Sequence, residues 1–187
     1  MNRTRPIRAR VLGTMAAAFL AAGPLLVSAP AWAANDADRA FVVEVHQGNL
    51  FEIQAGQDAA KRGGTDCVRQ AGARIAADHR KLDADVTALA RKIDVTLPTT
   101  PSDQARDTLT ELRDTDGAGY DALWVSTQVT AHEDTLKAID ARVAANTDPA
   151  VTAAAKKARP VVAAHLAMLD NGACTPMNMP SAPAMQH

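Results

Sequence analysis

The chain has 187 residues, with 20 Lys and Arg, 21 Asp and Glu, a formal net charge of −1 and only 3% aromatic residues. A nucleic-acid partner needs a concentrated positive surface and aromatic side chains for base stacking, so this composition excludes nucleic acid. The length corresponds to one domain.

Residues 1–33 are predicted to form a secretory signal peptide. Four arginines precede an apolar run over residues 11–27, and Ala31-Trp32-Ala33 has the small-x-small pattern of a cleavage site. Glycine and proline interrupt the run, which favours a cleaved leader over a retained anchor, and no membrane-spanning segment is expected after cleavage. We therefore expect an exported protein, of the periplasm or cell envelope or secreted, that begins at Ala34 after cleavage.

The rest of the chain is predicted to be all-α. Apolar residues recur at helical spacing after residue 35, and no segment alternates as a strand does. Long helices are expected over residues 36–61, 66–93 (with Thr65 as N-cap), 117–145 and 149–170. The sequence Thr100-Pro101-Ser102-Asp103 predicts the start of a short helix that ends near residue 113, with Thr100 as its cap and Pro101 in its first turn. A helical domain over residues 34–174 is followed by a tail, 175–187, that we expect to be disordered.

Two cysteines, Cys67 and Cys174, indicate a disulfide, because an exported chain meets oxidising conditions. In an up-down-up-down bundle they would lie at opposite ends, separated by a helix of roughly 37 Å, whereas bridged Cα atoms lie about 5.5 Å apart. A long crossover between the second and third long helices brings both cysteines to one end. The sequence therefore predicts a four-helix bundle with the long crossover of ferritin-like folds, and the short helix lies in that crossover.

Three of the long helices carry one histidine each on an apolar stripe with the spacing of a bundle core. The stripes are Val68, Gly72, Ile75, His79, Leu82, Val86, Leu89 and Ile93; Val125, Val129, His132, Leu136, Ile139 and Val143; and Val151, Ala155, Ala158, Val162, His165 and Leu169. His79 and His132 lie near the midpoints of their helices, so we expect them at one level of the bundle.

The first long helix allows two interpretations. The preferred stripe is Phe41, Val45, Gly48, Glu52, Ala55 and Ala59, which brings Glu52 into the core. A rotated stripe uses Val42, His46, Asn49, Ile53 and Gly56 instead.

Buried imidazoles need partners, and two explanations fit. A metal centre would use Glu52, His79, His132 and His165 as ligands, a set that suits a divalent metal such as zinc, or copper or iron. A hydrogen-bonded network including Asp78 would instead fix the register of the helices. A carboxylate-bridged di-iron centre is not expected, because glutamate does not stand three residues before His79 or His165.

A second candidate site, for a softer metal ion, lies near the end of the last helix. His165 and Met168 offer imidazole and thioether one turn apart, and the tail adds further methionines and a histidine. Thioether and imidazole suit copper(I). The alternative is a core methionine followed by a low-complexity tail. Asp78, His46 and Met168 are thus secondary candidates for the site.

Several short motifs, in this order and spacing, resemble an exported family, the domain of unknown function 4142, whose members often carry the label of outer membrane protein. The motifs are Phe41-Val42 through Glu52, Asp78-His79, Val95-Thr96-Leu97-Pro98, Gly119-Tyr120-Asp121 leading to His132, and Pro160 leading to His165-Leu166. The resemblance covers about residues 37–169. This chain departs from the family pattern at Ala131, where the family usually has aspartate, and at His46, where it commonly has a small residue.

The resemblance implies a ferritin-like bundle but no activity, and a related exported ferritin-like family is associated with copper handling. We expect an exported protein in metal or stress handling that is not an enzyme, with its protein partner unidentified. The alternative is a structural or interaction module of the cell envelope whose polar core only sets register. A ferritin-like oxidase or peroxidase ranks third, because carboxylates are few.

Overall fold

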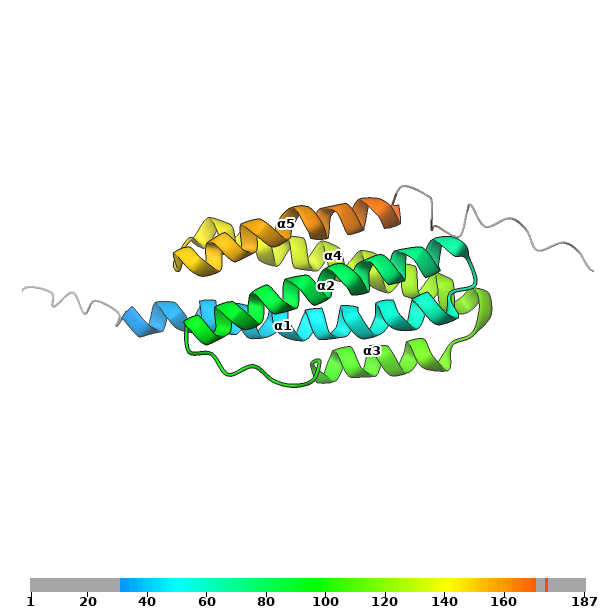
Figure 1. Cartoon of the computed structure of the whole chain (residues 1–187), viewed down its shortest axis with the longest axis horizontal. Coiled ribbons are helices and arrows are strands. Elements are labelled where there is room, and N and C mark those ends of the chain that lie inside the picture. The colour runs from blue at the N-terminus through cyan, green and yellow to red at the C-terminus, as the bar shows by residue number, and fades with distance from the viewer. Residues whose placement is uncertain (1–30, 171–173, 175–187) are drawn as a thin grey trace, which may run out of the picture.

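The computed structural model describes residues 31–170 and Cys174. Within these residues the chain forms five helices: α1 (Ala31–Arg62), α2 (Asp66–Lys92), α3 (Asp103–Asp114), α4 (Gly117–Ala145) and α5 (Pro149–Asp170) (Figure 1). The prediction of an all-α chain with a short third helix is confirmed. The signal peptide predicted over residues 1–33, apart from its last three residues, and the tail predicted over residues 175–187 lie outside the described residues.

Helix boundaries follow local signals closely, with two corrections. The predicted cap of α2 is confirmed, because the side chain of Thr65 accepts a hydrogen bond from the backbone N–H of Val68. For α3, the prediction of Thr100 as the cap is wrong. Ser102 caps α3 by accepting from the N–H of Ala105, and Pro101 precedes the helix. α1 begins at Ala31 and not at residue 36.

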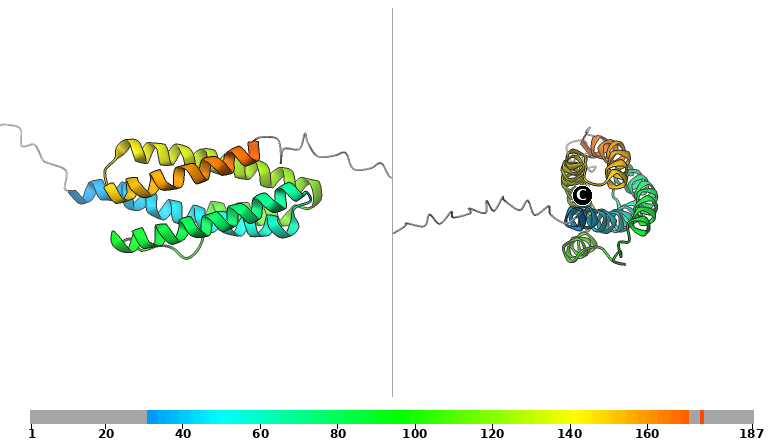
Figure 2. Two further views of the ribbon diagram at one scale, coloured as in Figure 1. Left: turned by 45° about the horizontal axis from the view of Figure 1, so that its top comes forward. Right: turned by 90° about the vertical axis from the view of Figure 1, so that its left-hand side faces the viewer.

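The four long helices pack as two antiparallel pairs, α1 with α2 and α4 with α5. α2 also contacts α5, and α1 contacts α4, which closes a ring of four helices seen from its end in Figure 2. The connection from α2 to α4 returns along the bundle and carries α3 on the outside of the ring, against α1 and α4 (Figures 1 and 2). The chain thus has the long crossover that the cysteine positions predict.

Close packing of α1 against α2 depends on two glycines that face each other. A Cβ atom on Gly56 would lie 2.6 Å from the carbonyl oxygen of Gly72, and a Cβ on Gly72 would lie 2.7 Å from that of Gly56. Such distances are shorter than carbon and oxygen atoms tolerate, so only glycine lets the two backbones approach this closely. Buried alanines extend this contact along both helices (Ala55, Ala59, Ala71, Ala76).

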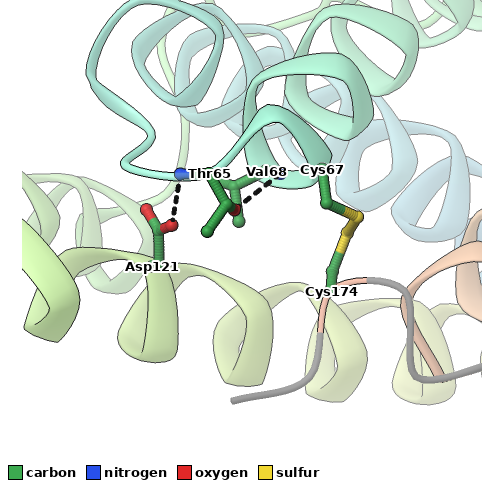
Figure 3. The surroundings of a disulfide bond; sticks show 5 residues. All are labelled: Thr65, Cys67, Val68, Asp121 and Cys174. Atoms are coloured by element: carbon green, nitrogen blue, oxygen red, sulfur yellow. Dashed lines mark hydrogen bonds between the residues drawn. A yellow bond between two sulfur atoms is a disulfide. The ribbon is translucent and has the colours of Figure 1, made fainter. Parts of the chain in front are cut away.

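A disulfide and a buried carboxylate hold one end of the bundle together (Figure 3). Cys67 and Cys174 are bonded, with Cα atoms 5.5 Å apart and a separation of 107 residues in the sequence, as predicted. Beside this bridge, Asp121 of α4 accepts hydrogen bonds from the backbone N–H groups of Gly64 (2.8 Å) and Thr65 (2.9 Å). The turn between α1 and α2 is therefore fixed to both α4 and the end of α5.

An ion pair joins the helices at the opposite end. The guanidinium of Arg142 donates to the carboxylate of Asp38 at 2.6 Å, and the hydroxyl of Thr147 donates to its other oxygen at 2.7 Å. Asp38 is only 2% exposed. Because Asp38 is buried and the Arg142 side chain is only 15% exposed, this ion pair fixes the start of α1 to the end of α4 more firmly than a surface pair would.

The buried face of α1 combines the two predicted stripes. In its first half the rotated stripe is buried, through Val42, His46 and Asn49, while Gly48 of the preferred stripe is exposed. In its second half the preferred stripe is buried. The buried residues there are Glu52, Ala55 and Ala59, joined by Phe51 and Gly56.

Large side chains fill the core at the disulfide end. Trp124 is fully buried, and its indole N–H donates to the carbonyl oxygen of Ala55 at 3.1 Å.

None of the helices in residues 31–170 combines the length and apolarity that a membrane crossing requires.

Candidate metal centre

Three histidines from three helices meet inside the bundle: His79 of α2, His132 of α4 and His165 of α5. Each is 5% exposed or less. The ring centroids lie 5.3–5.7 Å apart, and one ring nitrogen from each residue lies within 4.8 Å of those from the other two. The helical spacing that puts each histidine on a core stripe thus brings the three imidazoles together, and we call this group the histidine triad.

Each ring uses one nitrogen to bind an acceptor at the edge of the triad. His132 Nδ1 lies 2.8 Å from the backbone carbonyl oxygen of Gln128, and His79 Nδ1 lies 2.8 Å from Oδ1 of Asn49. His165 Nε2 lies 3.3 Å from a carboxylate oxygen of Asp78. All three partners accept hydrogen bonds, so these ring nitrogens are the natural positions for the N–H protons.

The other three nitrogens are then left as unprotonated acceptors. With the protons so placed, His132 Nε2 and His165 Nδ1 face each other at 3.3 Å with a lone pair on each. His79 Nε2 is buried and has no hydrogen-bond partner among the described residues. Lone pairs held together in this way repel one another, and a shared cation would remove the repulsion.

The spacing of two of these nitrogens suits a tetrahedral ion. Zinc–imidazole bonds are about 2.0–2.1 Å long, so two nitrogens on one tetrahedral ion lie about 3.3 Å apart. His132 Nε2 and His165 Nδ1 already have this separation. The third ring nitrogen lies within 4.8 Å of both and would need to move by on the order of 1 Å to complete the set.

Burial keeps the triad neutral, which is the form that binds metals. It lowers the pKa of His79 to about 3, with additional lowering from the neighbouring His132 and His165, and lowers that of His132 to about 4. Burial also lowers the pKa of His165, although Asp78 opposes the change. All three rings therefore hold a single proton near neutral pH.

Asp78 supports the triad from its edge. Its carboxylate pairs with Arg74 and with Lys81 (3.1 Å) on the same helix, as well as with His165. Partial burial opposes ionisation, but the hydrogen bonds from Arg74, Lys81 and His165 hold the pKa of Asp78 well below its usual range. An ionised carboxylate behind an imidazole fixes the ring's orientation and raises its basicity as a ligand.

Glu52, predicted as a fourth ligand, does not belong to the group of close ligand atoms that the three histidines form. The side chain is 5% exposed, and its Oε2 atom has no partner among the described residues. Burial raises the pKa of Glu52 to about 8; the amide of Gln128 is near enough to oppose this rise, without hydrogen-bonding geometry. Glu52 is therefore protonated near neutral pH, at the wall of a cavity that it shares with His79.

The cavity has a volume of about 470 Å³ and lies between α1, α2, α4 and α5. Alanine is its most frequent lining residue (Ala131, Ala138, Ala150, Ala153, Ala154, Ala158), and larger apolar residues complete the wall. Small side chains at positions where a bundle normally places leucine or isoleucine leave this space open.

The two remaining secondary candidates lie outside the triad. His46 contacts the carboxylate of Asp83 through Nδ1 (2.7 Å) and the carbonyl oxygen of Pro98 through Nε2 (2.9 Å), which anchors the connector after α2. Met168 packs against the apolar core that contains Trp124 and Leu169. Sequence reasoning did not identify Asn49 and Gln128 as partners of the triad. The one available signal was the presence of Asn49 on the rotated stripe.

Comparison with known proteins yields one result. No curated protein and no solved structure matched the chain. Residues 24–171 match a protein family described as "Domain of unknown function (DUF4142)". This match spans most of the sequence and includes every residue of the histidine triad, and the chain therefore belongs to the DUF4142 family.

Proposed function

We propose that this chain is an exported metal-binding protein that holds one metal ion on His79, His132 and His165. The observation that carries the proposal is the convergence of three unprotonated nitrogens, while the opposite nitrogen of each ring is bound to an acceptor. A metal ion at this point would accept all three lone pairs, and Asn49, Asp78 and the Gln128 carbonyl would orient the rings around it.

The donor set favours zinc or copper(II). Imidazole suits both ions, and three ring nitrogens leave one position of a tetrahedral ion for water or a ligand. Di-iron chemistry is not part of the proposal, because such centres use several carboxylates and the triad has only Asp78 beside it. Binding or buffering of the ion, and not oxidase activity, is the role that the donor set favours.

The proposal includes a ferritin-like fold and export. The antiparallel neighbours and the single long crossover are the features by which ferritin-like bundles are recognised. The disulfide between Cys67 and Cys174 supports an oxidising compartment such as the periplasm or cell envelope.

The alternative is an envelope module whose histidines only set helix register. A network without metal satisfies both contacts of His165 in one of two ways: His165 carries two protons, or His132 carries its proton on Nε2 and loses its hydrogen bond to the Gln128 carbonyl. Burial lowers the pKa of His165 and so disfavours the first of these. The network without metal thus carries a cost that a bound ion avoids.

The test is metal retention by the mature protein. The protein is stripped with a chelator, loaded with zinc or copper(II), passed through buffer exchange and analysed by elemental mass spectrometry. We expect one ion per chain, nitrogen hyperfine splitting in the copper(II) electron paramagnetic resonance spectrum, and loss of both in a His132→Gln, His165→Gln double variant. His46→Gln is the matched control and should retain the ion.

Circular dichroism distinguishes a lost site from a lost fold. If the folded wild-type protein retains no metal, or if the double variant retains as much as the wild type, the metal proposal is wrong. The first of these outcomes supports the register-setting alternative.

A further inference from the structure

The cavity beside Glu52 has the properties of a binding site for a small organic molecule. Its volume of about 470 Å³ lies within the range of small-molecule sites in proteins, and its walls are mainly apolar. Phe41, Val45, Leu82, Val86 and Leu89 form one side, and the alanines of α4 and α5 form the other. An unfilled space of this size in a bundle core loses packing energy unless something occupies it.

Three buried polar residues with an unpaired atom line this space: Glu52, Asn49 and His79. Glu52 is 5% exposed, is protonated near neutral pH, and has an Oε2 atom without a hydrogen-bond partner among the described residues. A buried carboxyl group without a hydrogen bond is costly, so a ligand oxygen at this point would stabilise both molecules. Asn49 lines the same cavity, and its Nδ2 atom is likewise without a partner.

The charges around the cavity select against anions. Glu44, Asp85 and Asp134 are exposed residues of the lining, and they are accompanied by a single basic residue, Lys157, which is paired with Asp85 at 2.7 Å. An anionic ligand would meet net negative charge at the rim and would lose its hydration inside an apolar space.

From these observations we propose that the cavity binds a neutral, mainly apolar molecule with one hydroxyl or carbonyl oxygen, and that this oxygen accepts a hydrogen bond from the Glu52 carboxyl group. The apolar body lies along the alanines of α4 and α5. The site does not require the metal ion, because Glu52 lies outside the histidine triad.

The test uses N-phenyl-1-naphthylamine, a neutral apolar dye that becomes fluorescent in apolar surroundings, with the mature, metal-free protein. Three competitors of equal chain length are compared: decanol, decanoate and decylammonium. We expect the dye to bind at one site per chain and decanol to displace it at least tenfold more effectively than decanoate. Decylammonium should be weaker than decanol as well, because its charge loses hydration in the apolar interior.

Two pairs of variants test whether the ligand binds in this cavity and whether Glu52 donates the hydrogen bond. Ala154→Phe fills the cavity and should weaken dye binding at least tenfold, whereas Ala167→Phe, on an exposed position of the same helix, should not. Glu52→Leu should weaken decanol about tenfold. Glu52→Gln should bind it within about twofold of the wild type, because an amide also donates a hydrogen bond.

Three results would overturn the proposal: no dye binding by the folded wild type, equal binding by Ala154→Phe, or decanoate competing as well as decanol. The His132→Gln, His165→Gln double variant should keep dye binding unchanged. The cavity and metal proposals can therefore fail independently of each other.

Discussion

The stability of the metal-free protein should have a maximum near pH 6.5, because two sets of buried groups act in opposite directions. Glu52 has a pKa of about 8 in the folded protein and an ordinary value of 4.5. Between these values the folded state holds a proton that the unfolded chain has released. The contribution of Glu52 to the free energy of unfolding therefore decreases as pH rises, by about 1.4 kcal/mol per pH unit. From pH 6.5 to pH 8 the contribution of Glu52 falls by about 1.6 kcal/mol, and His79 and His132, which are half protonated in the unfolded chain at pH 6.5, offset about 0.8 kcal/mol of this fall.

The histidines act below that maximum. The pKa values of His79 and His132 are about 3 and about 4 in the folded protein, against an ordinary value of 6.5. Below pH 6.5 the unfolded chain binds two protons that the folded state does not, so stability decreases as pH falls, by about 2.7 kcal/mol per pH unit. Glu52 offsets about half of this loss until pH 4.5, and His165 adds to the loss, because its pKa is lowered as well.

The free energy of unfolding can be measured by urea titration, followed by circular dichroism, at pH 8, 6.5 and 5 in the presence of a chelator. Glu52→Gln should remove the decrease between pH 6.5 and pH 8 and make the decrease below pH 6.5 steeper, because the offset from Glu52 is lost. Glu44→Gln, an exposed position of the same helix, should change neither. The same change in stability between pH 6.5 and pH 8 in the wild type and in Glu52→Gln would refute the assignment of the alkaline decrease to Glu52.

Four further predictions concern the scaffold. Replacing both Cys67 and Cys174 by serine should lower the free energy of unfolding by about 4–5 kcal/mol in the chain-entropy model, measured by urea titration. Gly56→Ala should destabilise the protein by at least about 1–3 kcal/mol, because the new Cβ overlaps α2. Gly48→Ala on the same helix meets no atom within 4 Å and should stabilise by up to about 1 kcal/mol in the same titration. Asp121→Ala leaves two backbone N–H groups without their acceptor and should cost about 1–3 kcal/mol, visible as a lower melting temperature than that of the wild type.

The second long helix shows what the sequence can predict. Its apolar residues follow one repeat from Val68 to Val86, and all the positions of that repeat between them are buried, His79 included. Similarly, the two cysteines excluded one of two bundle topologies by distance alone. In both cases a single geometric constraint left one solution.

The buried face of the first long helix could not be predicted from the sequence. Different helices cover the two halves of α1: Val42 belongs to a cluster with residues of α2 and α5, whereas Ala55 and Ala59 belong to a cluster with residues of α2, α3 and α4. Over the 32 residues of α1, the face toward the core changes from the Val42–His46 stripe to the Glu52–Ala55 stripe. No single stripe could describe it. Neither could the sequence predict the contact of His132 with the Gln128 carbonyl, because every residue has a carbonyl group.

The distribution of polar groups favours a functional centre over a register-setting network. At both ends of the bundle the buried carboxylates are fully engaged: Asp38 with Arg142 and Thr147, and Asp121 with the backbone of the α1–α2 turn. In the middle, buried polar atoms on three helices have no partner among the described residues. These are Asn49 Nδ2, Glu52 Oε2, His79 Nε2 and both amide atoms of Gln128.

A network that served only to align helices would gain most from complete pairing, because each unpaired buried group costs about 1–3 kcal/mol. Ends held in this way can keep such a costly centre in place, because a metal ion on the histidine triad would supply a partner for His79 Nε2, and a neutral ligand in the cavity would supply partners for Glu52 and Asn49.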